Sequence, residues 1–246
     1  MEVQLPGMFD VEVTFQPIVS VPTGSAAGAE ALLRGRIEGT AFPPRALVRQ
    51  LRARECPVAE LVIGHIACAF DLWDDVGVDP VWCSLNLDAW DLEHGRPDEM
   101  IADVVGAERA HRVVVELSEL HPLDPSRAGS VLERLRKLGV TIAIEDFGVG
   151  QAASDQLDLL EPAYIKIGRF FIDKIQEPGP GRATVRVATS LGRRAGVGVI
   201  AEGVERVVQL QHLTRLGCPL AQGFLFSPAI DAEAFVDVAG RRLGRD

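Results

Sequence analysis

The sequence predicts an α/β protein built as an eight-stranded barrel of the TIM type. Eight apolar runs of strand length alternate with amphipathic segments of helix length. Most of these runs are apolar throughout, as parallel strands buried on both faces are. A chain of 246 residues is also an ordinary length for one such barrel. The same alternation allows one alternative, an open doubly wound sheet.

The elements follow one another in a regular order along the chain. The expected strands are Val13–Val19, Ser25–Leu33, Val81–Leu87, Arg112–Leu117, Thr141–Ile144, Ala163–Ile167, Val197–Ala201 and Ala221–Phe226. The expected helices are Pro44–Arg54, Val58–Trp73, a helix from Pro125 to Gly139, Arg182–Arg194, one ending before Gly217, and Asp231–Leu243. Asp124 before Pro125 is a typical helix start, and Gly139 and Gly217 are typical helix ends.

Composition and charge exclude several classes of protein. The chain has 25 basic and 35 acidic residues, so its net charge is −10 and it is a poor candidate for binding a nucleic-acid polymer. No apolar run approaches the 18 residues of a membrane segment, and the N-terminus lacks the basic start of a signal peptide. The four cysteines form no CxxC pair. We therefore expect a cytoplasmic protein whose cysteines are reduced core residues.

Polar residues recur at the C-terminal ends of the expected strands. In chain order they are Glu30 and Arg34, Asn86, Glu116 with Glu119, Glu145 and Asp146, Lys166, Glu202 with Glu205, and Gln222. One acidic residue at a strand end is ordinary, because strand ends are commonly exposed to solvent. In a barrel, however, these ends share one mouth, which is where the active site lies.

Several carboxylates in one barrel mouth would repel one another, and bound divalent cations commonly neutralise such repulsion. Oxygen ligands select Mg²⁺ or Mn²⁺ rather than zinc, and the residues offered are Glu30, Asn86, Glu116, Glu145 and Asp146. Two such ions side by side suit phosphodiester hydrolysis. Lys166 would add a positive charge for the phosphate or the nucleophile.

Taken together, these strand ends closely resemble the EAL-domain cyclic di-GMP phosphodiesterases. The naming motif stands as Glu30-Ala31-Leu32, followed by Leu33 and Arg34. The other matching segments are FQPIVS, LNLD with Asn86, ELSE with Glu116 and Glu119, IAIEDFGVG with Glu145 and Asp146, YIKIG with Lys166, AEGVE with Glu202 and Glu205, and QGFLFSPAI with Gln222. The resemblance spans nearly the whole chain, so we expect residues 1–246 to form a single EAL domain.

The resemblance implies a modified TIM barrel whose first strand runs antiparallel to the others. It also implies hydrolysis of cyclic di-GMP to linear pGpG with two Mg²⁺ or Mn²⁺ ions. One ion would be held by Glu30, Asn86 and Glu116. Glu145 would bridge to the second ion, which Asp146 would serve with Lys166 beside it.

The resemblance assigns further roles around these ligands. Glu202 would act near the attacking water as base or orienting group, and Glu205 would support the site. Arg34 would reach a phosphate of the ligand, with Leu32 of the naming motif also on the substrate side. Glu119 would support the loop after the fifth strand, and Gln222 would belong to the floor of the site. The family also implies a homodimer and a regulatory or sensor partner.

Several positions depart from the family pattern. The loop after the fifth strand begins with Glu145 where the family has aspartate, and it continues with Val149 where the family has threonine. The serines that usually follow are replaced around 151–153, and Gly168 stands where an aspartate is usual. Gly35 replaces a tryptophan after Arg34. These changes gather around the second metal and around a loop that couples dimerisation to activity in the family.

Three hypotheses follow from the matches and the departures. The first is an active phosphodiesterase, which is favoured because Glu30, Asn86, Glu116, Lys166 and Glu202 all persist. The second is a degenerate EAL domain that binds cyclic di-GMP or a protein partner without cleavage. The third is an unrelated metal-dependent barrel such as an enolising lyase, for which the sequence offers no substrate-carboxylate site. If the Glu145 side chain limits the rate, Glu145→Asp should raise it.

Overall fold

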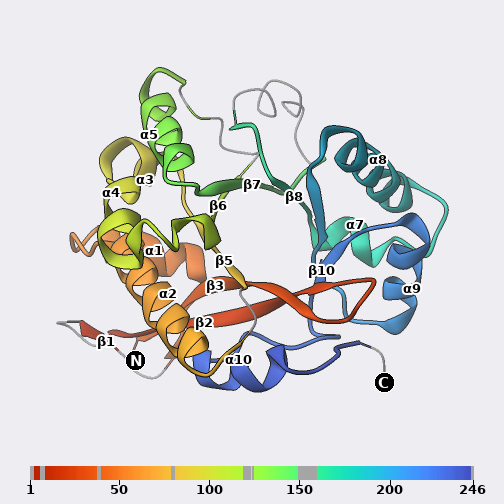
Figure 1. Ribbon diagram of the computed structural model, residues 1–246, viewed down its shortest axis with the longest axis horizontal. Coiled ribbons are helices and arrows are strands. Elements are labelled where there is room, and N and C mark those ends of the chain that lie inside the picture. Colours follow the sequence, from red (N-terminus) through yellow and green to blue (C-terminus); the bar gives the residue numbers. More distant parts are fainter. Residues whose placement is uncertain are drawn as a thin grey trace.

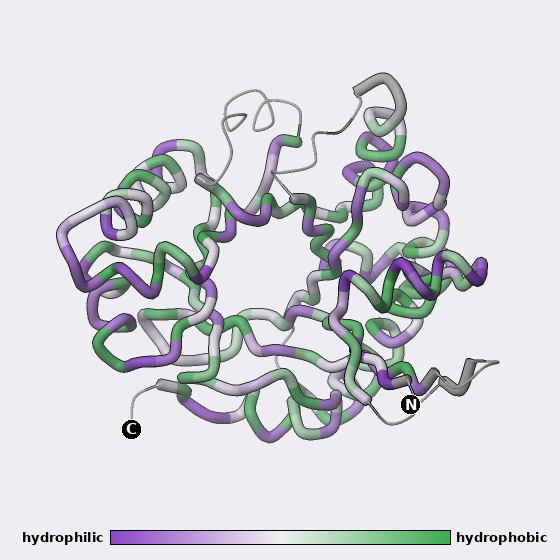
Figure 2. The backbone as a smooth tube through the Cα atoms, turned by 180° about the vertical axis from the view of Figure 1, so that it is seen from behind, coloured by the Kyte–Doolittle hydropathy of each residue, from purple (hydrophilic) through white to green (hydrophobic). Residues whose placement is uncertain are grey.

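The strands form one sheet that closes into a barrel (Figure 1). The computed structural model describes residues 3–5, 9–37, 40–78, 81–118, 123, 125–148 and 160–244. Within these ranges the strand order is β1-β2-β10-β9-β8-β7-β6-β5-β3-β4, and β2 pairs with both β10 and β3. That second pairing closes eight of the described strands into a ring and leaves β1 and β4 as extensions at its edge. Figure 2 shows the ring from behind, with the helices outside it.

The described elements have the following bounds. The strands are β1 (Val3–Leu5), β2 (Phe9–Ser20), β3 (Ala26–Ile37), β4 (Thr40–Ala41), β5 (Trp82–Asn86), β6 (Val113–Ser118), β7 (Thr141–Glu145), β8 (Tyr164–Ile167), β9 (Gly198–Ala201) and β10 (Leu220–Gln222). The helices are α1 (Pro44–Arg52), α2 (Val58–Asp75), α3 (Ala89–His94), α4 (Pro97–Met100), α5 (Pro125–Lys137), α7 (Arg169–Asp173), α8 (Pro180–Ala195), α9 (Val207–Leu216) and α10 (Ala232–Ala239). A π-helical segment (Ile101–Gly106) and a short 3-10 segment (Ala110–Arg112) precede β6.

The strand directions confirm the modified TIM barrel with its first strand antiparallel. β2 runs antiparallel to β3 and to β10, whereas β3, β5, β6, β7, β8, β9 and β10 are parallel to their neighbours in that series. An open doubly wound sheet, the alternative from the sequence, is excluded because β2 bridges the two ends of the parallel series. As predicted, α5 and α9 end before glycines with left-handed backbone, Gly139 at φ +86° and Gly217 at φ +72°.

Three of the expected strands were wrong in extent. The first two strands are longer than predicted, because β2 and β3 form an antiparallel hairpin whose ladder runs from Phe9↔Ile37 to Val19↔Ala26. Glu30 therefore lies inside β3 rather than near its end. The last strand is shorter than predicted. It stops at Gln222, because Gly223 follows with φ +155° and the chain turns there.

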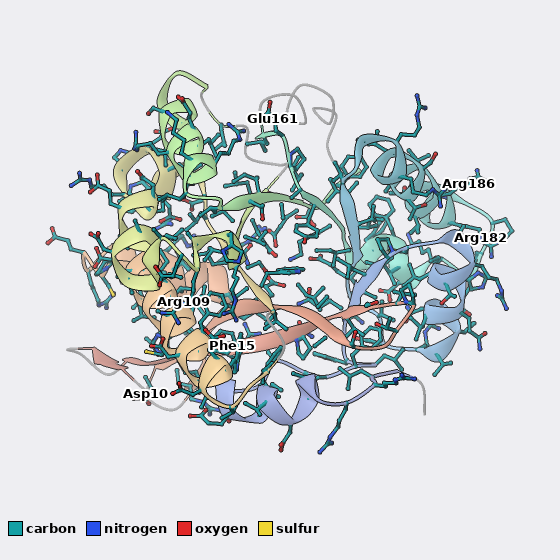
Figure 3. The ribbon with its side chains drawn as sticks, viewed as in Figure 1. Asp10, Phe15, Arg109, Glu161, Arg182 and Arg186 are labelled. Atoms are coloured by element: carbon teal, nitrogen blue, oxygen red, sulfur yellow. The ribbon has the colours of Figure 1, made fainter. Side chains whose placement is uncertain are left out.

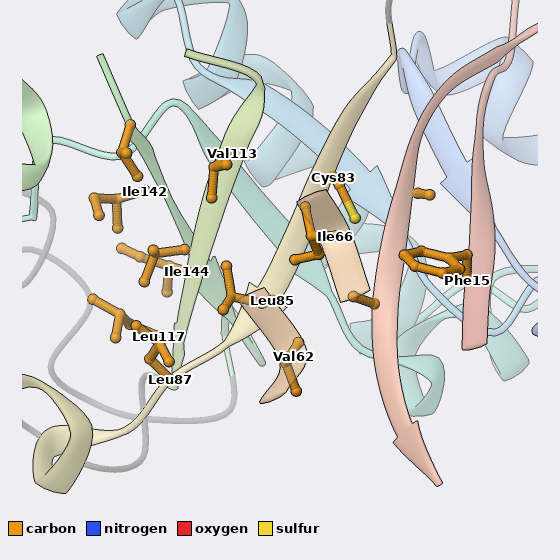
Figure 4. Packing of buried hydrophobic residues seen from close by; sticks show 14 of the residues in the cluster. Phe15, Val62, Ile66, Cys83, Leu85, Leu87, Val113, Leu117, Ile142 and Ile144 are labelled. Atoms are coloured by element: carbon orange, nitrogen blue, oxygen red, sulfur yellow. The ribbon is translucent and has the colours of Figure 1, made fainter. Parts of the chain in front are cut away.

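The hydrophobic core lies between the outer face of the barrel and the helices around it. Figure 4 shows Val62 and Ile66 of α2 facing Leu85 of β5, all within one buried cluster. Farther along α2, the fully buried Trp73 stacks on Phe235 of α10 at 4.5 Å between ring centroids. This packing orients the strands and thereby their inward-facing side chains.

Two aromatic rings fill the barrel interior below the polar ends of the strands. Trp82 of β5 and Tyr164 of β8 stack with their centroids 4.9 Å apart. Glycines on the neighbouring strands leave space for them: a Cβ added at Gly28 would lie 2.5 Å from the Trp82 ring, and one at Gly198 would lie 2.5 Å from the Tyr164 ring. The interior at this level is thus packed, as in other small barrels.

Ion pairs tie α2 to the segment that leads into β6. Arg109, labelled in Figure 3, donates to Asp71 of α2 at 2.6 Å. The buried Arg112 donates to Asp74 at 2.7 Å and lies 4.1 Å from the centre of the Phe70 ring. These contacts fix the start of β6, which carries Glu116.

The four cysteines are free, as expected. Cys83 and Cys218 are buried and Cys56 is partly buried. Cys68 is exposed, so its prediction as a core residue was wrong. It belongs to α2, where a helix buried on one side leaves part of its surface in water, and an apolar run does not say which residues lie there.

Candidate functional site

The strand register brings the polar side chains to one end of the barrel interior. Residues paired across neighbouring strands point to the same side of a sheet, and successive residues alternate. Asn86 pairs with Glu116, Glu30 pairs with Gln16, and Lys166 lies two residues beyond the inward-facing Tyr164. The inward-facing positions near the carboxyl ends of the parallel strands therefore form a single polar layer above the Trp82–Tyr164 stack.

Lys166 lies at the centre of this layer. Its side chain is fully buried, and its Nζ contacts four carboxylates. The distances from Nζ are 2.6 Å to Glu116, 2.8 Å to Glu202, 3.1 Å to Glu30 and 3.6 Å to Glu145. These carboxylates come from four different strands or strand ends, so the barrel assembles the cluster.

Glu30 is held by amide groups as well as by Lys166. Asn86 donates through Nδ2 to Glu30 Oε1 at 2.9 Å, and Gln222 donates through Nε2 to Glu30 Oε2 at 2.8 Å. The same Gln222 nitrogen also donates to Gln16 Oε1 at 3.0 Å. Charge-assisted hydrogen bonds of this kind fix a carboxylate more firmly than neutral ones do. The position of Glu30 is therefore set by side chains from three other strands, β5, β8 and β10.

Burial and mutual repulsion govern the protonation of the carboxyl groups. Burial raises the pKa of Glu116 well above its usual value, and the neighbouring Glu30 carboxylate raises it further. Burial likewise raises the pKa of Glu202, against the opposing effect of Lys166. Burial alone would raise the pKa of Glu30 as well. The Lys166 charge and the hydrogen bonds from Gln222, Lys166 and Asn86 outweigh that effect and bring the pKa below its usual value.

Burial and the neighbouring charges shift the pKa of Lys166 in directions opposite to those for the carboxyl groups. Burial alone would lower the pKa of its ammonium group, but Glu116, Glu202, Glu30 and Glu145 together raise that pKa well above the usual value. Lys166 therefore stays protonated at neutral pH. One ammonium group faces four carboxyl groups, so ionisation of all four would leave the cluster with negative charge that attracts cations.

The donor set fits a divalent cation. Glu30, Glu116 and Glu145 each offer a carboxylate oxygen, and these atoms lie within 4.8 Å of one another. The Glu116 Oε1 atom is buried without a hydrogen-bond partner, which is costly unless another group engages it. Asn86 donates to Glu30 through its nitrogen, so its amide oxygen is the atom that it could offer to a cation. Ligands of oxygen alone suit Mg²⁺ and Mn²⁺.

Asp146 lies beside this group rather than in it. Its backbone is left-handed, with φ +55°, which is uncommon for a residue other than glycine. The next residue, Phe147, donates its backbone N–H to the carbonyl of Lys166 at 3.0 Å. A Cβ added at Gly168 would lie 3.2 Å from Asp146 Oδ1. The Asp146 carboxylate thus lies close to the end of β8. It occupies space beside Gly168, which has no side chain.

The remaining predicted residues lie around this cluster. Glu205 pairs with Arg169 of α7 at 2.8 Å. Arg34 is partly buried on β3 and donates to the carbonyl of Leu33 at 3.4 Å, and Leu32 precedes both on the same strand. Glu119, Val149 and the positions 151–153 lie outside the described residues. The sequence therefore grouped seven residues that the structure also brings together: Glu30, Asn86, Glu116, Glu145, Lys166, Glu202 and Gln222.

Comparison with known proteins agrees with this arrangement. A family model for the EAL domain matches residues 8–229. The chain belongs to the EAL domain family. The EAL chain is 32% identical over 229 residues to the bifunctional diguanylate cyclase/cyclic di-GMP phosphodiesterase MucR of Pseudomonas aeruginosa, covering 89% of this chain and 33% of MucR. It is 27% identical over 240 residues to the probable cyclic di-GMP phosphodiesterase PdeB of Escherichia coli, covering 95% of this chain and 45% of PdeB.

Solved structures with the same EAL fold are also similar. The PaMucR phosphodiesterase in its c-di-GMP complex has a TM-score of 0.82 at 28% identity, covering 92% of this chain and 94% of that one. The EAL enzyme Bd1971, in its cAMP- and cyclic-di-GMP-bound form, has a TM-score of 0.84 at 25% identity, covering 93% of this chain and 64% of that one. The EAL chain spans between about a third and a half of the length of the curated relatives named above.

Sequence reasoning missed two polar residues of the EAL site. Gln16 accepts from Gln222 and donates through Nε2 to the carbonyl of Ser227 at 3.2 Å, which links β2 to the chain after β10. Arg169 holds Glu205. Gln16 stands inside the FQPIVS segment, and the alternation of that strand places it on the side opposite Phe15. Nothing local identifies Arg169, because its partner lies 36 positions farther along the chain.

Proposed function

We propose that this EAL domain hydrolyses cyclic di-GMP to the linear dinucleotide pGpG. The observation that carries the proposal is the cluster of four carboxylates around the buried Lys166 at the barrel mouth. Relatives named as cyclic di-GMP phosphodiesterases, and a similar structure described as a c-di-GMP complex, support the choice of substrate.

Two Mg²⁺ or Mn²⁺ ions would complete the site. Glu30, Asn86 and Glu116 would hold the first ion, and Glu145 would bridge to the second, which Asp146 would serve. When bound, such ions stabilise negative charge on phosphate oxygens and make water a stronger nucleophile at neutral pH. The buried, unpartnered Glu116 Oε1 atom supports this assignment within the described residues.

The chain's own residues would then position and stabilise the reacting groups. Glu202 would take the proton of the attacking water, a role that suits a carboxylate whose pKa burial has raised. Lys166, which stays protonated, would place positive charge near the phosphate. Arg34 would reach a phosphate of the ligand.

Other residues would line or support the site. Leu32 and Gln222 would lie beside the ligand, and Gln222 also fixes Glu30. Glu205, anchored by Arg169, would support the mouth. Glu119 would support the loop after β7.

A direct assay tests this proposal. The purified protein is incubated with cyclic di-GMP and Mn²⁺ or Mg²⁺, and pGpG is followed by chromatography, with EDTA added to a parallel sample. We expect product that depends on the metal and is lost in Glu30→Gln. Glu12→Gln is the matched control, because Glu12 is an exposed glutamate on the same hairpin. Activity unchanged in Glu30→Gln would contradict the assignment of the site.

A second function, binding of cyclic di-GMP without cleavage, is favoured by one observation. Asp146 lies outside the group of three carboxylates that could share a metal ion, and Gly168 beside it carries no acid. A site with only one metal would bind the ligand and turn it over poorly. Binding by calorimetry together with the absence of pGpG at high enzyme concentration would establish this receptor function instead.

The wider setting of the protein is also a proposal. We propose that residues 1–246 form one EAL domain, that it forms a homodimer, and that a regulatory or sensor partner controls it in the cytoplasm. Among the described residues, no helix is both long and apolar enough to cross a membrane.

A further inference from the structure

The loop between β9 and α9 carries two of the acidic residues of the site. Glu202 and Glu205 lie in the five residues from 202 to 206, which connect the end of β9 to the start of α9. The backbone of this loop is pinned at its centre, because Val204 donates to the carbonyl of Gln222 at 3.0 Å and accepts from Leu225 at 2.9 Å. Glu202 also donates its backbone N–H to the carbonyl of Ile167 at 3.0 Å. The second half of the loop needs a separate anchor.

Gln209 supplies that anchor. It lies in the first turn of α9 and is fully buried, which is unusual for an uncharged polar side chain unless all its groups are bonded. Its Oε1 accepts from the backbone N–H groups of Glu205 and Arg206, both at 2.9 Å. Its carbonyl end therefore closes the loop onto the helix.

The other end of the same amide reaches α7. Gln209 Nε2 donates to the carbonyl of Ile172 at 3.3 Å and approaches Asp173 Oδ1 at 3.5 Å. Helix α7 begins two residues after Ile167, the last residue of β8, and β8 carries Lys166. A single buried side chain thus connects the loop of Glu202 and Glu205 with the helix that follows Lys166.

The link matters because Glu202 and Lys166 must stay in contact across two strand ends. Glu202 Oε1 lies 2.8 Å from Lys166 Nζ. Two other described side-chain links join α7 and this loop: the ion pair of Arg169 with Glu205, which is partly exposed, and a long hydrogen bond of 3.5 Å from the exposed Arg206 side chain to the carbonyl of Asp173. Exposed links of this kind are weak, and Gln209 is the buried member of the three.

We propose that Gln209 is a positioning residue for the reaction: its amide fixes the loop of Glu202 and Glu205 against α7 and thereby keeps Glu202 aligned with Lys166. The inference rests on the proposed phosphodiesterase function. A glutamine is required because both halves of the amide are used, one as acceptor and one as donor. Glutamate supplies only the acceptor, and methionine supplies neither.

These chemical differences define the test. Gln209→Glu keeps the acceptor for Glu205 and Arg206 but loses the donor toward α7 and places a second carboxylate near Asp173. Gln209→Met loses both connections. Gln211→Met is the matched control, because Gln211 is an exposed glutamine on the same helix. Thermal unfolding by circular dichroism identifies any variant that fails to fold; if Gln209→Met does so, Gln209→Glu carries the comparison.

We expect kcat for hydrolysis to fall at least tenfold in Gln209→Glu and in Gln209→Met, with KM within about twofold of the wild-type value. Misplacement of a reacting group by about 1 Å costs up to about a hundredfold in rate, while ligand contacts made elsewhere are unaffected. Gln211→Met should match the wild type. A wild-type kcat in Gln209→Glu would overturn the proposal, because Gln209 would then act only as a cap of α9.

Hydrogen exchange of the Glu205 and Arg206 amides, measured by NMR without metal or substrate, gives a readout independent of activity. Exchange should be faster in Gln209→Met than in the wild type and unchanged in Gln211→Met. If the wild type produces no pGpG, the phosphodiesterase proposal fails, and exchange still decides whether Gln209 holds the loop. Equal protection in Gln209→Met and the wild type would overturn the anchor itself.

Discussion

Replacing Lys166 with methionine should strongly destabilise the metal-free protein. Methionine preserves most of the length and the apolar stem of lysine but removes the ammonium group. Among the described side chains, Lys166 is the only cation that contacts the cluster of Glu30, Glu116, Glu145 and Glu202. Its loss leaves four carboxylates close together with no compensating charge.

The structure gives the size of the effect. At an effective dielectric constant of about 20, opposite unit charges attract by about 6 kcal/mol at the 2.6 Å of the Lys166–Glu116 contact and by about 5 kcal/mol at the 3.6 Å of the Lys166–Glu145 contact. Desolvation of the buried ions and repulsion among the carboxylates offset most of this attraction. Removing one partner of a buried ion pair therefore costs about 3–5 kcal/mol, or a hundredfold to a few thousandfold in the unfolding equilibrium.

Urea denaturation of the wild type and Lys166→Met, in EDTA and in Mn²⁺, measures this cost. Lys137→Met is the control, because Lys137 forms an exposed pair with Glu133 whose loss should cost far less stability. We expect Mn²⁺ to restore part of the stability of Lys166→Met, since a bound cation replaces the missing charge. The reasoning is refuted if Lys166→Met is as stable as Lys137→Met in EDTA.

The cluster also leads to three further predictions. Glu30→Ala should abolish pGpG formation, because Glu30 connects Asn86, Gln222 and Lys166, whereas Glu12→Ala should not; chromatography checks both. Glu145→Asp should weaken Mn²⁺ binding in a calorimetric titration and should not raise the rate of hydrolysis. The reason is that the longer Glu145 side chain already brings its carboxylate oxygen within 4.8 Å of those of Glu30 and Glu116. A faster variant would contradict this prediction. The loss of stability in Lys166→Met should be larger at pH 8 than at pH 5.5. Burial raises the pKa values of Glu116 and Glu202 in the folded protein and Lys166 lowers them, so both pKa values rise further in Lys166→Met. The folded variant then holds more of the protons that the unfolded chain has released, and its stability falls more than that of the wild type as pH rises. Equal losses at both pH values would count against this reasoning.

Much of the fold could be predicted from local patterns. Apolar runs and helical periodicity identified all eight barrel strands, and polar residues at their ends identified the candidate site. Pattern alone misplaced Glu30 toward a strand end, because it does not show how far a hairpin ladder continues. It also extended the last strand beyond Gln222, where the backbone of Gly223 turns the chain.

The sequence by itself determined the chemistry of this protein: which strands exist, which acids, amides and lysine stand near their ends, and which family these residues resemble. Only the tertiary structure decided that Lys166 contacts four carboxylates at once, that Gln16 joins Gln222, and that Gln209 bridges α9 to α7. The physical reason is sequence separation. Gln222 and Gln16 lie 206 positions apart, and they meet only because β2 pairs with β10 and closes the barrel. No local propensity specifies a contact of that range, whereas barrel closure fixes all of them together.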